Sequence, residues 1–157
     1  MKKILIAGAG SYIGVSFRNY MNQYKNDYIV DTLDLKNKSW RKKNFSDYDV
    51  IFHVAGIAHI KETKGNAELY YKVNKDLTLE VAKKAKKDKV KQFIFLSSMS
   101  VYGLEVGTIT RKTIPTPNTN YGKSKLMAEE ALNKLSDDNF KVAILRPPMV
   151  YGEGCKR

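Results

Sequence analysis

The stretch that decides the fold of this chain lies near its start and reads I-L-I-A-G-A-G-S-Y-I-G, residues 4–14. Its first four residues form a continuous apolar run, which is typical of a strand buried on both faces of a parallel sheet. Three glycines follow between positions 8 and 14, and the pattern from Tyr12 to about Tyr24 predicts a helix. The stretch is therefore a strand, a glycine-rich turn and the start of a helix.

This order of elements indicates a binding site for a diphosphate. Glycines allow the backbone to turn tightly and approach a diphosphate, and the free N–H groups and dipole of the helix start favour its negative charge. The spacing is G-x-G-x-x-x-G, which differs by one residue from the usual dinucleotide fingerprint. The interpretation therefore depends on the strand before the glycines and the helix after them. The alternative is a tight turn that holds no ligand.

The rest of the chain alternates between strand and helix patterns. Leu69, Val73, Leu77 and Val81 recur every four residues and indicate a helix over 68–87. This alternation favours βαβ units and a parallel sheet. We expect one α/β domain over residues 1–157, with a doubly wound, mostly parallel sheet of at least five strands. Further strands are predicted at 28–35, 49–55, 90–97 and 142–145, and a further helix at 120–135.

Composition restricts the class of protein. Of the 157 residues, 43% are hydrophobic and 28% are charged, as in ordinary soluble domains. Lys and Arg number 28 against 16 Asp and Glu, and much of the excess lies in 36–43 and 83–91. These runs lack interleaved aromatic residues, so we interpret them as a loop and a solvated face and expect no nucleic-acid partner.

The few cysteines and histidines exclude other classes. Cys155 is the one cysteine, so no internal disulfide can form and a reducing compartment is expected. With only His53 and His59 besides, no transition-metal ligand set is evident. We expect His53 to lie in the core and His59 at the surface. No stretch approaches the roughly 20 apolar residues that span a bilayer, so we expect a cytoplasmic protein without a membrane partner.

Asp34 stands at the end of the second predicted strand, 20 residues after Gly14. A carboxylate there can accept hydrogen bonds from the adenosine ribose and repels a 2′-phosphate, which favours NAD over NADP. Lys36 and Lys38 are near enough in sequence to weaken that preference. A surface aspartate at a strand end is the alternative interpretation.

Two further motifs carry chemistry. In Y-G-K-S-K, residues 121–125, the phenol and the final ammonium share one helix face, and the positive charge favours the phenolate. In F-L-S-S-M-S-V-Y-G, residues 95–103, serines cluster where a parallel strand ends, which is the edge at which open α/β sheets bind ligands. A hydroxyl there can donate to a carbonyl oxygen beside the phenol, although serines at such positions also serve as turn or cap residues.

Together these motifs resemble the extended short-chain dehydrogenase/reductase family, and within it the NAD-dependent epimerase/dehydratase branch that acts on nucleotide sugars. The resemblance covers essentially the whole chain. Its other supports are D-V-I-F-H-V-A-G (49–56), Y-Y-K-V-N (70–74) and L-R-P-P-M-V-Y-G (145–152). It implies a Rossmann-like fold, NAD as the cofactor, a nucleotide-sugar substrate and a homodimer formed through the helices at 69–81 and 121–135.

The resemblance also implies roles for individual residues. Tyr121 matches the acid–base, Lys125 its pKa-lowering partner and ribose ligand, and Ser98 the residue that hydrogen-bonds the reacting sugar oxygen. The implied cofactor-binding residues are Gly8, Gly10, Ser11, Tyr12, Ile13, Gly14, Asp34, Ala55, Gly56, Asn74, Tyr121, Lys125 and Pro147.

Some positions depart from the family pattern. Ser11 replaces a usual glycine, and Met149 replaces a frequent asparagine. Met99 and Ser100 follow Ser98 where the dehydratases carry Asp-Glu, which argues against elimination of water. The expected activity is that of an enzyme, a UDP-glucose 4-epimerase-like nucleotide-sugar epimerase. A 4-keto-sugar reductase or dehydrogenase of polysaccharide synthesis and a non-catalytic dinucleotide-binding protein are the alternatives.

In the family a second, smaller domain that binds the nucleotide sugar follows the V-Y-G segment. This chain has only five residues after Gly152. We therefore expect the cofactor half and the catalytic residues, with most of the substrate domain absent and turnover weak.

Overall fold

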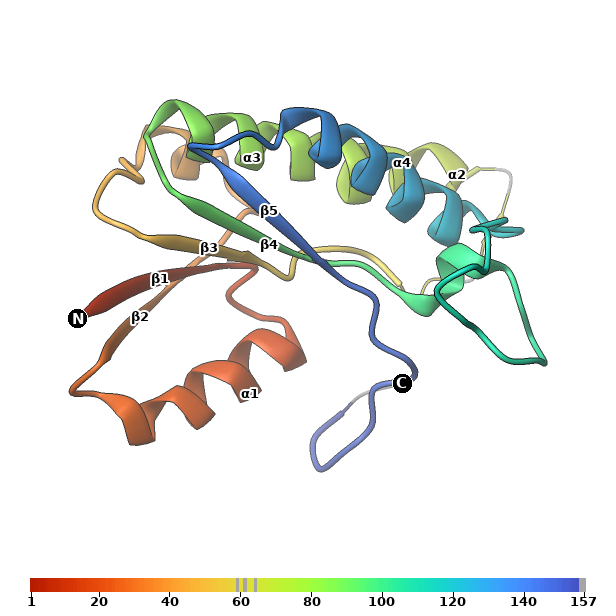
Figure 1. The fold of residues 1–157 in the computed structure, drawn as a ribbon, viewed down its shortest axis with the longest axis horizontal. Helices are drawn as coiled ribbons and strands as arrows, with labels where there is room; N and C mark the ends of the chain where they lie inside the picture. Colours follow the sequence, from red (N-terminus) through yellow and green to blue (C-terminus); the bar gives the residue numbers. More distant parts are fainter. Residues whose placement is uncertain (59, 61, 64, 156–157) are drawn as a thin grey trace.

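The computed structural model describes residues 1–58, 60, 62–63 and 65–155. The expectation for His59 lies outside the described residues. Within them, five strands form one sheet in the order β2-β1-β3-β4-β5, and every neighbouring pair is parallel (Figure 1). The strands are β1 (Lys2–Ala7), β2 (Tyr28–Leu33), β3 (Val50–His53), β4 (Gln92–Leu96) and β5 (Lys141–Leu145).

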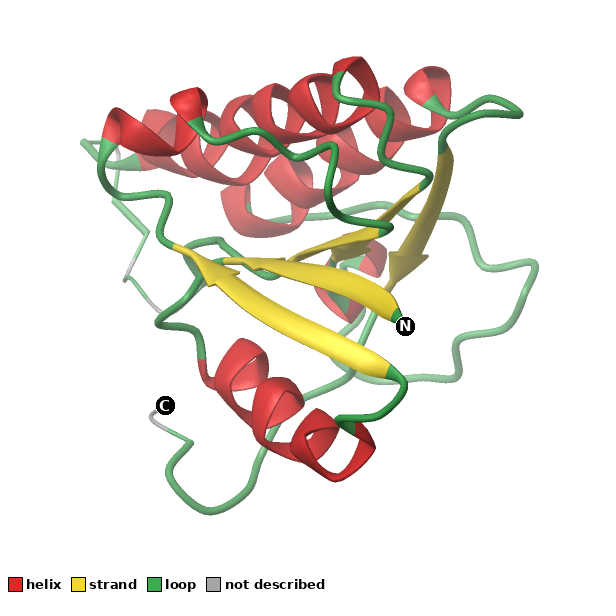
Figure 2. Ribbon diagram, turned by 90° about the vertical axis from the view of Figure 1, so that its left-hand side faces the viewer, coloured by secondary structure: helices red, strands yellow, loops and turns green. Residues whose placement is uncertain are grey.

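Helices cover both faces of this sheet (Figures 1 and 2). One face carries α1 (Tyr12–Met21), and the other carries α2 (Ala67–Tyr70), α3 (Thr78–Lys87) and α4 (Asn120–Leu135). Ile6 and Phe52 belong to the core on the α1 face, whereas Leu5 and Ile51 belong to the larger core on the other face. Each strand thus buries alternate side chains on opposite faces, and the expected doubly wound, Rossmann-like fold is confirmed.

The strand register brings the carboxyl ends of the strands to one edge of the sheet. Ala7 pairs with His53, and Leu96 pairs with Leu145. Beyond the ladder, the Gly8 N–H donates to the Leu33 oxygen at 2.9 Å, and the Ser97 N–H donates to the Leu145 oxygen at 2.7 Å. The segments that follow β1, β3 and β4 therefore begin side by side, at the edge where open α/β sheets bind ligands.

Three expected elements differ in detail. The first helix ends at Met21 and continues as a 3-10 turn, η1 (Asn22–Tyr24). The helix expected over 68–87 contains a π-helical stretch, η3 (Tyr71–Leu77), between α2 and α3. There the Thr78 hydroxyl donates to the Asn74 main-chain oxygen at 2.8 Å, a side-chain bond of the kind that alters local helix geometry.

The lysine-rich segment is the third difference, because a 3-10 helix, η2 (Lys38–Lys42), is found where the sequence predicts a loop. Asn37 caps it by accepting a hydrogen bond from the Ser39 N–H at 2.9 Å. The helix carries Trp40 into the core, and the following Phe45 is also buried. Burial of these two rings supplies the apolar contact that holds a polar segment in place.

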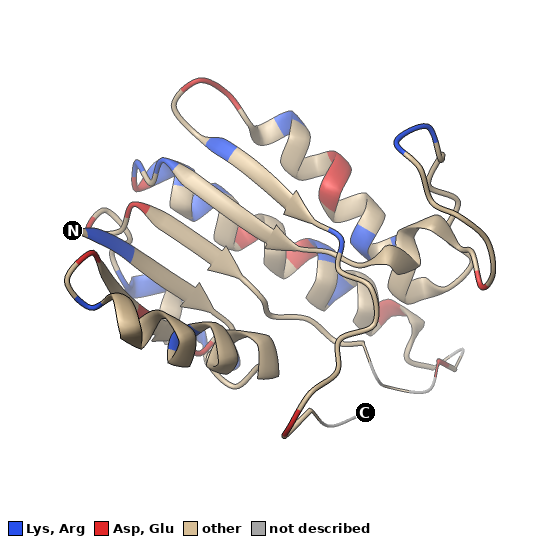
Figure 3. Ribbon diagram, turned by 60° about the horizontal axis from the view of Figure 1, so that its bottom comes forward, with Lys and Arg blue, Asp and Glu red and all other residues tan. Residues whose placement is uncertain are grey.

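Basic residues 83–91 occupy the end of α3 and the turn into β4, at the opposite edge of the sheet from the strand carboxyl ends (Figure 3). Lys84 pairs with Asp88 at 2.9 Å and Lys86 pairs with Asp137 at 2.6 Å. Among the described residues, no helix combines the length and hydropathy needed to cross a bilayer.

Candidate active site

The turn after β1 is shaped by glycines with different surroundings. Gly8 has a φ of +124°, and a Cβ atom there would stand 2.7 Å from the Ala55 nitrogen. A Cβ on Gly14 would stand 3.0 Å from the Ile6 side chain, whereas one on Gly10 would meet nothing within 4 Å. Ser11 caps α1 by accepting a hydrogen bond from the Gly14 N–H at 3.0 Å. The turn is packed against the sheet on one side and open at Gly10.

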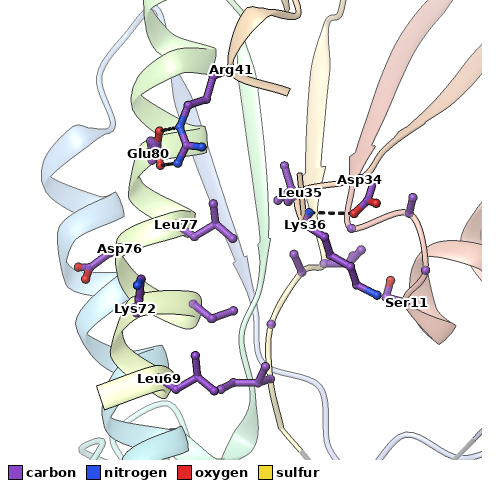
Figure 4. A pocket seen from close by; sticks show the side chains of 18 residues that line it. Ser11, Asp34, Leu35, Lys36, Arg41, Leu69, Lys72, Asp76, Leu77 and Glu80 are labelled. Carbon is purple, nitrogen blue, oxygen red and sulfur yellow. Dashed lines mark hydrogen bonds and ion pairs between the residues drawn. The ribbon is translucent and has the colours of Figure 1, made fainter. Parts of the chain in front are cut away.

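A cavity of about 810 Å³ opens beside this turn, between the strand ends and the helical stretch of α2, η3 and α3 (Figure 4). Six of the predicted cofactor-binding residues line it: Gly8, Gly10, Ser11, Asp34, Ala55 and Gly56. Asp34 is exposed, and one of its carboxylate oxygens accepts a hydrogen bond from the Lys36 N–H at 2.9 Å. The carboxylate is thereby oriented beside the cavity, and its predicted contact with the adenosine ribose stays a prediction.

An ion pair that the sequence analysis missed closes one end of the cavity. The Arg41 guanidinium on η2 donates to both carboxylate oxygens of Glu80 on α3, and the Nη2 bond measures 2.7 Å. Figure 4 shows the pair across from Asp34. The two residues are 39 positions apart, so no local pattern could have indicated the pair.

Ser98 follows β4 and caps a short 3-10 helix, η4 (Met99–Tyr102). Its hydroxyl accepts from the Ser100 N–H at 3.1 Å and donates to the Ser100 hydroxyl at 3.1 Å. Tyr121 is the second residue of α4. Burial raises the pKa of Tyr121 above its ordinary value, although the nearby Ser98 side chain acts to lower it. The predicted serine is thus near enough to the predicted acid–base to influence its pKa, and the roles of both residues stay predictions.

Lys125 is buried one turn further along α4. Its ammonium donates to the Leu96 main-chain oxygen at 2.8 Å and lies 4.7 Å from the centre of the Phe95 ring. Burial lowers the pKa of Lys125 to about 8, although the nearby Glu129 carboxylate acts to raise it. A Cβ on Gly56 would stand 3.2 Å from the Lys125 Nζ, so this ammonium borders a residue that lines the cavity. Its expected effect on the pKa of Tyr121 stays a prediction.

Asn74 is fully buried behind the cavity, where its amide is engaged with protein groups. Its oxygen accepts from the Ile57 N–H at 2.9 Å, and its nitrogen donates to the Ile57 oxygen and the Ser124 hydroxyl, both at 3.1 Å. These bonds hold the loop after β3 against α4. The predicted contact between Asn74 and a cofactor remains a prediction.

His53 is fully buried, as expected of a core histidine. Its Nε2 lies 3.0 Å from the Thr78 hydroxyl, and its ring stacks on Phe93. Burial lowers the pKa of His53 to about 3, so the ring is neutral and acts in packing.

Residues after β5 pass close to both Ser98 and the first helix. The Pro147 oxygen accepts a hydrogen bond from the Met99 N–H at 3.1 Å. Further on, a Cβ on Gly152 would stand 2.6 Å from the Tyr12 hydroxyl. Pro147 and Tyr12, both predicted to contact the cofactor, thus flank the same edge of the sheet.

A charge network around the buried Glu129 was also missed. Glu129 on α4 accepts hydrogen bonds from Ser97 and from Arg146, whose Nε lies 3.0 Å from Oε1. The second guanidinium branch donates to the Tyr102 hydroxyl at 2.6 Å. The hydrogen bonds with Glu129 raise the pKa of Arg146. The network joins the segments that follow β4 and β5 to the helix that carries Tyr121.

The sheet, the glycine turn and the cavity at the strand carboxyl ends define a Rossmann-like α/β protein. Residues 4–157 match the NAD dependent epimerase/dehydratase family, and the chain belongs to that family.

The chain is 32% identical, over 99% of its length, to the UDP-glucose 4-epimerase of Vibrio cholerae, of which it covers 54%. It is 28% identical, over 96% of its length, to the N-acetyl-alpha-D-glucosaminyl-diphospho-ditrans,octacis-undecaprenol 4-epimerase of Escherichia coli O157:H7, of which it covers 49%. It therefore spans about half the length of these relatives.

Solved structures show the same fold. The UDP-glucuronic acid 4-epimerase of Bacillus cereus in complex with NAD superposes with a TM-score of 0.81 at 24% identity, over 96% of this chain and 57% of that one. The UDP-Glc/GlcNAc 4-epimerase of Campylobacter jejuni superposes with a TM-score of 0.75 at 27% identity, over 93% and 53%.

Proposed function

We propose that this chain forms the cofactor-binding and acid–base part of an NAD-dependent nucleotide-sugar epimerase that resembles UDP-glucose 4-epimerase. The observation that carries the proposal is that the Lys125 ammonium, on the helix of Tyr121, lies 3.2 Å from where a Cβ on the cavity-lining Gly56 would stand. The names of the relatives from V. cholerae and C. jejuni support the epimerase assignment.

The residues around the cavity fit a dinucleotide. Gly10 leaves room for a diphosphate beside the start of α1, and Asp34 presents a carboxylate suited to a ribose and unfavourable for a 2′-phosphate. NAD would be held by the 8–14 turn, Asp34, Ala55 and Gly56. When bound, NAD supplies a hydride acceptor that can return the hydride to the sugar carbon.

The chain's own residues handle the proton. Tyr121 takes the proton of the reacting sugar hydroxyl and later returns it, while the Ser98 hydroxyl hydrogen-bonds the same oxygen. Burial raises the pKa of Tyr121. In this proposal the positive charge of Lys125 opposes that effect by favouring the phenolate. The effect of Ser98 on the pKa of Tyr121 supports the pairing of these two side chains.

The rival activities use overlapping residues. A 4-keto-sugar reductase would use the same serine, tyrosine and lysine but would consume NADH stoichiometrically. A dehydratase would need the acid and base that family members carry after the serine, whereas Met99 and Ser100 stand there in this chain and the Ser100 side chain accepts a hydrogen bond from Ser98. A non-catalytic dinucleotide-binding protein would bind NAD and show no dependence on Tyr121.

The test combines binding and turnover. Calorimetry should show that the chain binds NAD in preference to NADP. Adding UDP-glucose or UDP-glucuronic acid should then produce absorbance at the NADH wavelength, or an epimerised sugar visible by NMR. Tyr121→Phe should lower that rate by about 10²-fold or more, because the proton acceptor is lost, and should still bind NAD through the 8–14 turn and Asp34.

Tyr20→Phe is the matched control, since Tyr20 lies exposed on α1 and hydrogen-bonds only Tyr24 through its hydroxyl among the described contacts. It should behave as the unaltered chain does. A chain that binds no NAD, or a Tyr121→Phe variant that turns over as fast as the unaltered chain, would refute the proposal.

A further inference from the structure

The loop between β3 and α2 contacts the start of the catalytic helix through one carboxylate. We propose that Glu62 is a positioning residue for Tyr121, holding the first turn of α4 so that the phenol faces Ser98. The inference rests on the proposed role of Tyr121 as the acid–base. It concerns a residue that none of the sequence motifs contains.

The contacts of Glu62 are specific to the helix start. One carboxylate oxygen accepts from the Asn120 N–H at 3.0 Å and from the Asn120 side-chain nitrogen at 3.1 Å. The other accepts from the Tyr121 N–H at 2.9 Å. Thr119 satisfies the next donor, because its hydroxyl accepts from the Gly122 N–H at 3.0 Å. The first N–H groups of a helix have no partners within the helix, so Glu62 supplies two of the three bonds that fix this turn.

Neighbouring tyrosines tie both the loop of Glu62 and the start of α4 to the helical stretch of α2 and η3. The Tyr71 hydroxyl donates to the Asn120 side-chain oxygen at 2.9 Å, and the Tyr70 hydroxyl donates to the Ile60 oxygen in the loop of Glu62. The Tyr70 ring also meets the Tyr121 ring edge-on, with centroids 6.5 Å apart. Glu62 therefore sits in a cluster of polar and aromatic contacts around the base of the Tyr121 side chain.

The charge of Glu62 suits this place. Burial acts to raise the pKa of Glu62, but hydrogen bonds from the Tyr121 and Asn120 N–H groups and the charge of Lys123 together bring it below its usual value. The carboxylate is thus ionised at neutral pH, and a negative charge at a helix start is favourable. A neutral amide of equal size would keep the shape and lose the charge and one acceptor.

Removal of the Glu62 carboxylate should affect Tyr121 more than Lys125. Tyr121 is the second residue of α4, directly bonded to Glu62, whereas Lys125 lies a turn later and is anchored by Leu96. Loosening the first turn should displace the phenol from Ser98 while Lys125 and the cavity stay in place. Separation from Ser98 acts to raise the pKa of Tyr121, whereas loss of the nearby Glu62 charge acts to lower it, so the titration of the phenol reports on both.

The experiment compares Glu62→Gln with Glu68→Gln in the whole chain. Glu68 is the matched control, because it lies exposed in the first turn of the neighbouring helix α2. With tyrosine labelled at the Cζ carbon, NMR titration should show the pKa of the Tyr121 phenol changed in Glu62→Gln and unchanged in Glu68→Gln. Amide exchange at residues 120 and 121 should accelerate by about tenfold or more, and NAD affinity should stay within about twofold.

Turnover completes the test. If the chain converts a nucleotide sugar, Glu62→Gln should lower kcat by about tenfold with KM nearly constant, since the binding residues are untouched. Asn120→Ala, which keeps both backbone donors, should have a smaller effect on the phenol. An unchanged phenol titration with unchanged exchange would overturn the inference. A chain that does not bind NAD, or a Tyr121→Phe variant with an unchanged turnover rate, would instead refute the proposed function. The two failures can be told apart, because the phenol titration and the amide exchange report on Glu62 without any turnover.

Discussion

The glycines of the first turn show how far single residues can be interpreted from sequence. The strand–turn–helix context predicted the turn correctly, but the spacing does not say what each glycine does. In the structure, a Cβ at Gly8 would approach the Ala55 backbone to 2.7 Å, while one at Gly10 would have no neighbour within 4 Å. Close packing against the segment that follows β3 thus requires a glycine at position 8, whereas Gly10 keeps the backbone open to the cavity. This difference depends on residues far along the chain, such as Ala55.

Gly10→Ala should separate binding from folding. The added methyl group meets no protein atom within 4 Å, so the thermal midpoint should stay within about 2 °C of the unaltered chain. NAD affinity should fall by about tenfold or more, because the methyl group stands where the diphosphate must approach the backbone. Calorimetric titration and thermal unfolding measure the two effects.

Gly14→Ala provides the contrast to this variant. Its Cβ would stand 2.7 Å from the Ser11 hydroxyl and 3.0 Å from the Ile6 side chain, so stability itself should drop. A Gly10→Ala chain that binds NAD with full affinity would show that the diphosphate does not lie over this turn.

Lys125 makes a second prediction for a single residue. Its ammonium should titrate near pH 8, because burial lowers the pKa of Lys125 to about 8 from an ordinary value of 10.5. The unfolded chain then binds more protons than the folded chain between these two values. The contribution of Lys125 to folding stability should therefore rise as the pH increases from about 8 toward 10.5.

Carbon-detected NMR of the lysine side chains can follow this titration, with the signal assigned by its absence in Lys125→Arg. An ammonium that titrates at the ordinary lysine value would mean that the group is hydrated and does not occupy the buried place beside Leu96.

Among the elements, strands were predicted more accurately than helices. The apolar runs at 4–7, 49–55 and 90–97 each coincide with an observed strand, since burial on both faces leaves an unmistakable pattern. The helix over 68–87 contains the π-helical stretch η3. The four-residue spacing from Leu69 to Val81 predicts a helix but does not distinguish a π-helical stretch from an α-helix. The lysine-rich 3-10 helix η2 was missed because it is stabilised by burial of two rings, Trp40 and Phe45, in the core. Such tertiary packing cannot be predicted from the helix propensity of the local sequence.

The contact between α4 and η4 gives a prediction for these elements. A Cβ on Gly122 would stand 2.5 Å from the Ser100 oxygen and 2.9 Å from the Pro117 side chain. Gly122→Ala should therefore push α4 away from the segment that carries Ser98 and destabilise the chain by about 1–3 kcal/mol. Denaturant unfolding measures the loss, and the Tyr121 phenol titration reports the lost contact with Ser98.

Ala128→Gly is a comparison on the same helix, since it lowers stability by removing a buried methyl group without forcing α4 and η4 apart. It should leave the phenol titration unchanged. Equal stability of Gly122→Ala and the unaltered chain would mean that the two elements can separate at no cost.

At the scale of the whole molecule, the candidate site is assembled from contacts that no single segment reveals. The order of the motifs predicted Ser98, Tyr121 and Lys125, but their supports come from other parts of the chain. Glu62 lies 58 positions before Asn120, and Arg146 lies 17 positions after Glu129. Such pairs depend on how loops converge at the carboxyl edge of the sheet, so they become visible only when the fold is known.

The arrangement of helices also bears on assembly. The family resemblance predicts a homodimer through the helical stretch at 69–81 and α4, which lie together on one face of the sheet (Figure 1). On α4, Met127 is 40% exposed, which leaves an apolar side chain available to a second copy. We expect sedimentation equilibrium to show a dimer.

A charge at this position should oppose dimerisation, because burying it without a partner is costly. Met127→Glu should raise the dimer dissociation constant by about tenfold or more. Val15→Glu provides the control, since Val15 is 37% exposed on α1, on the opposite face of the sheet, and should leave the constant unchanged. If both variants and the unaltered chain sediment as monomers, the helical face of this chain does not pair two copies, and the expectation drawn from the family fails for it.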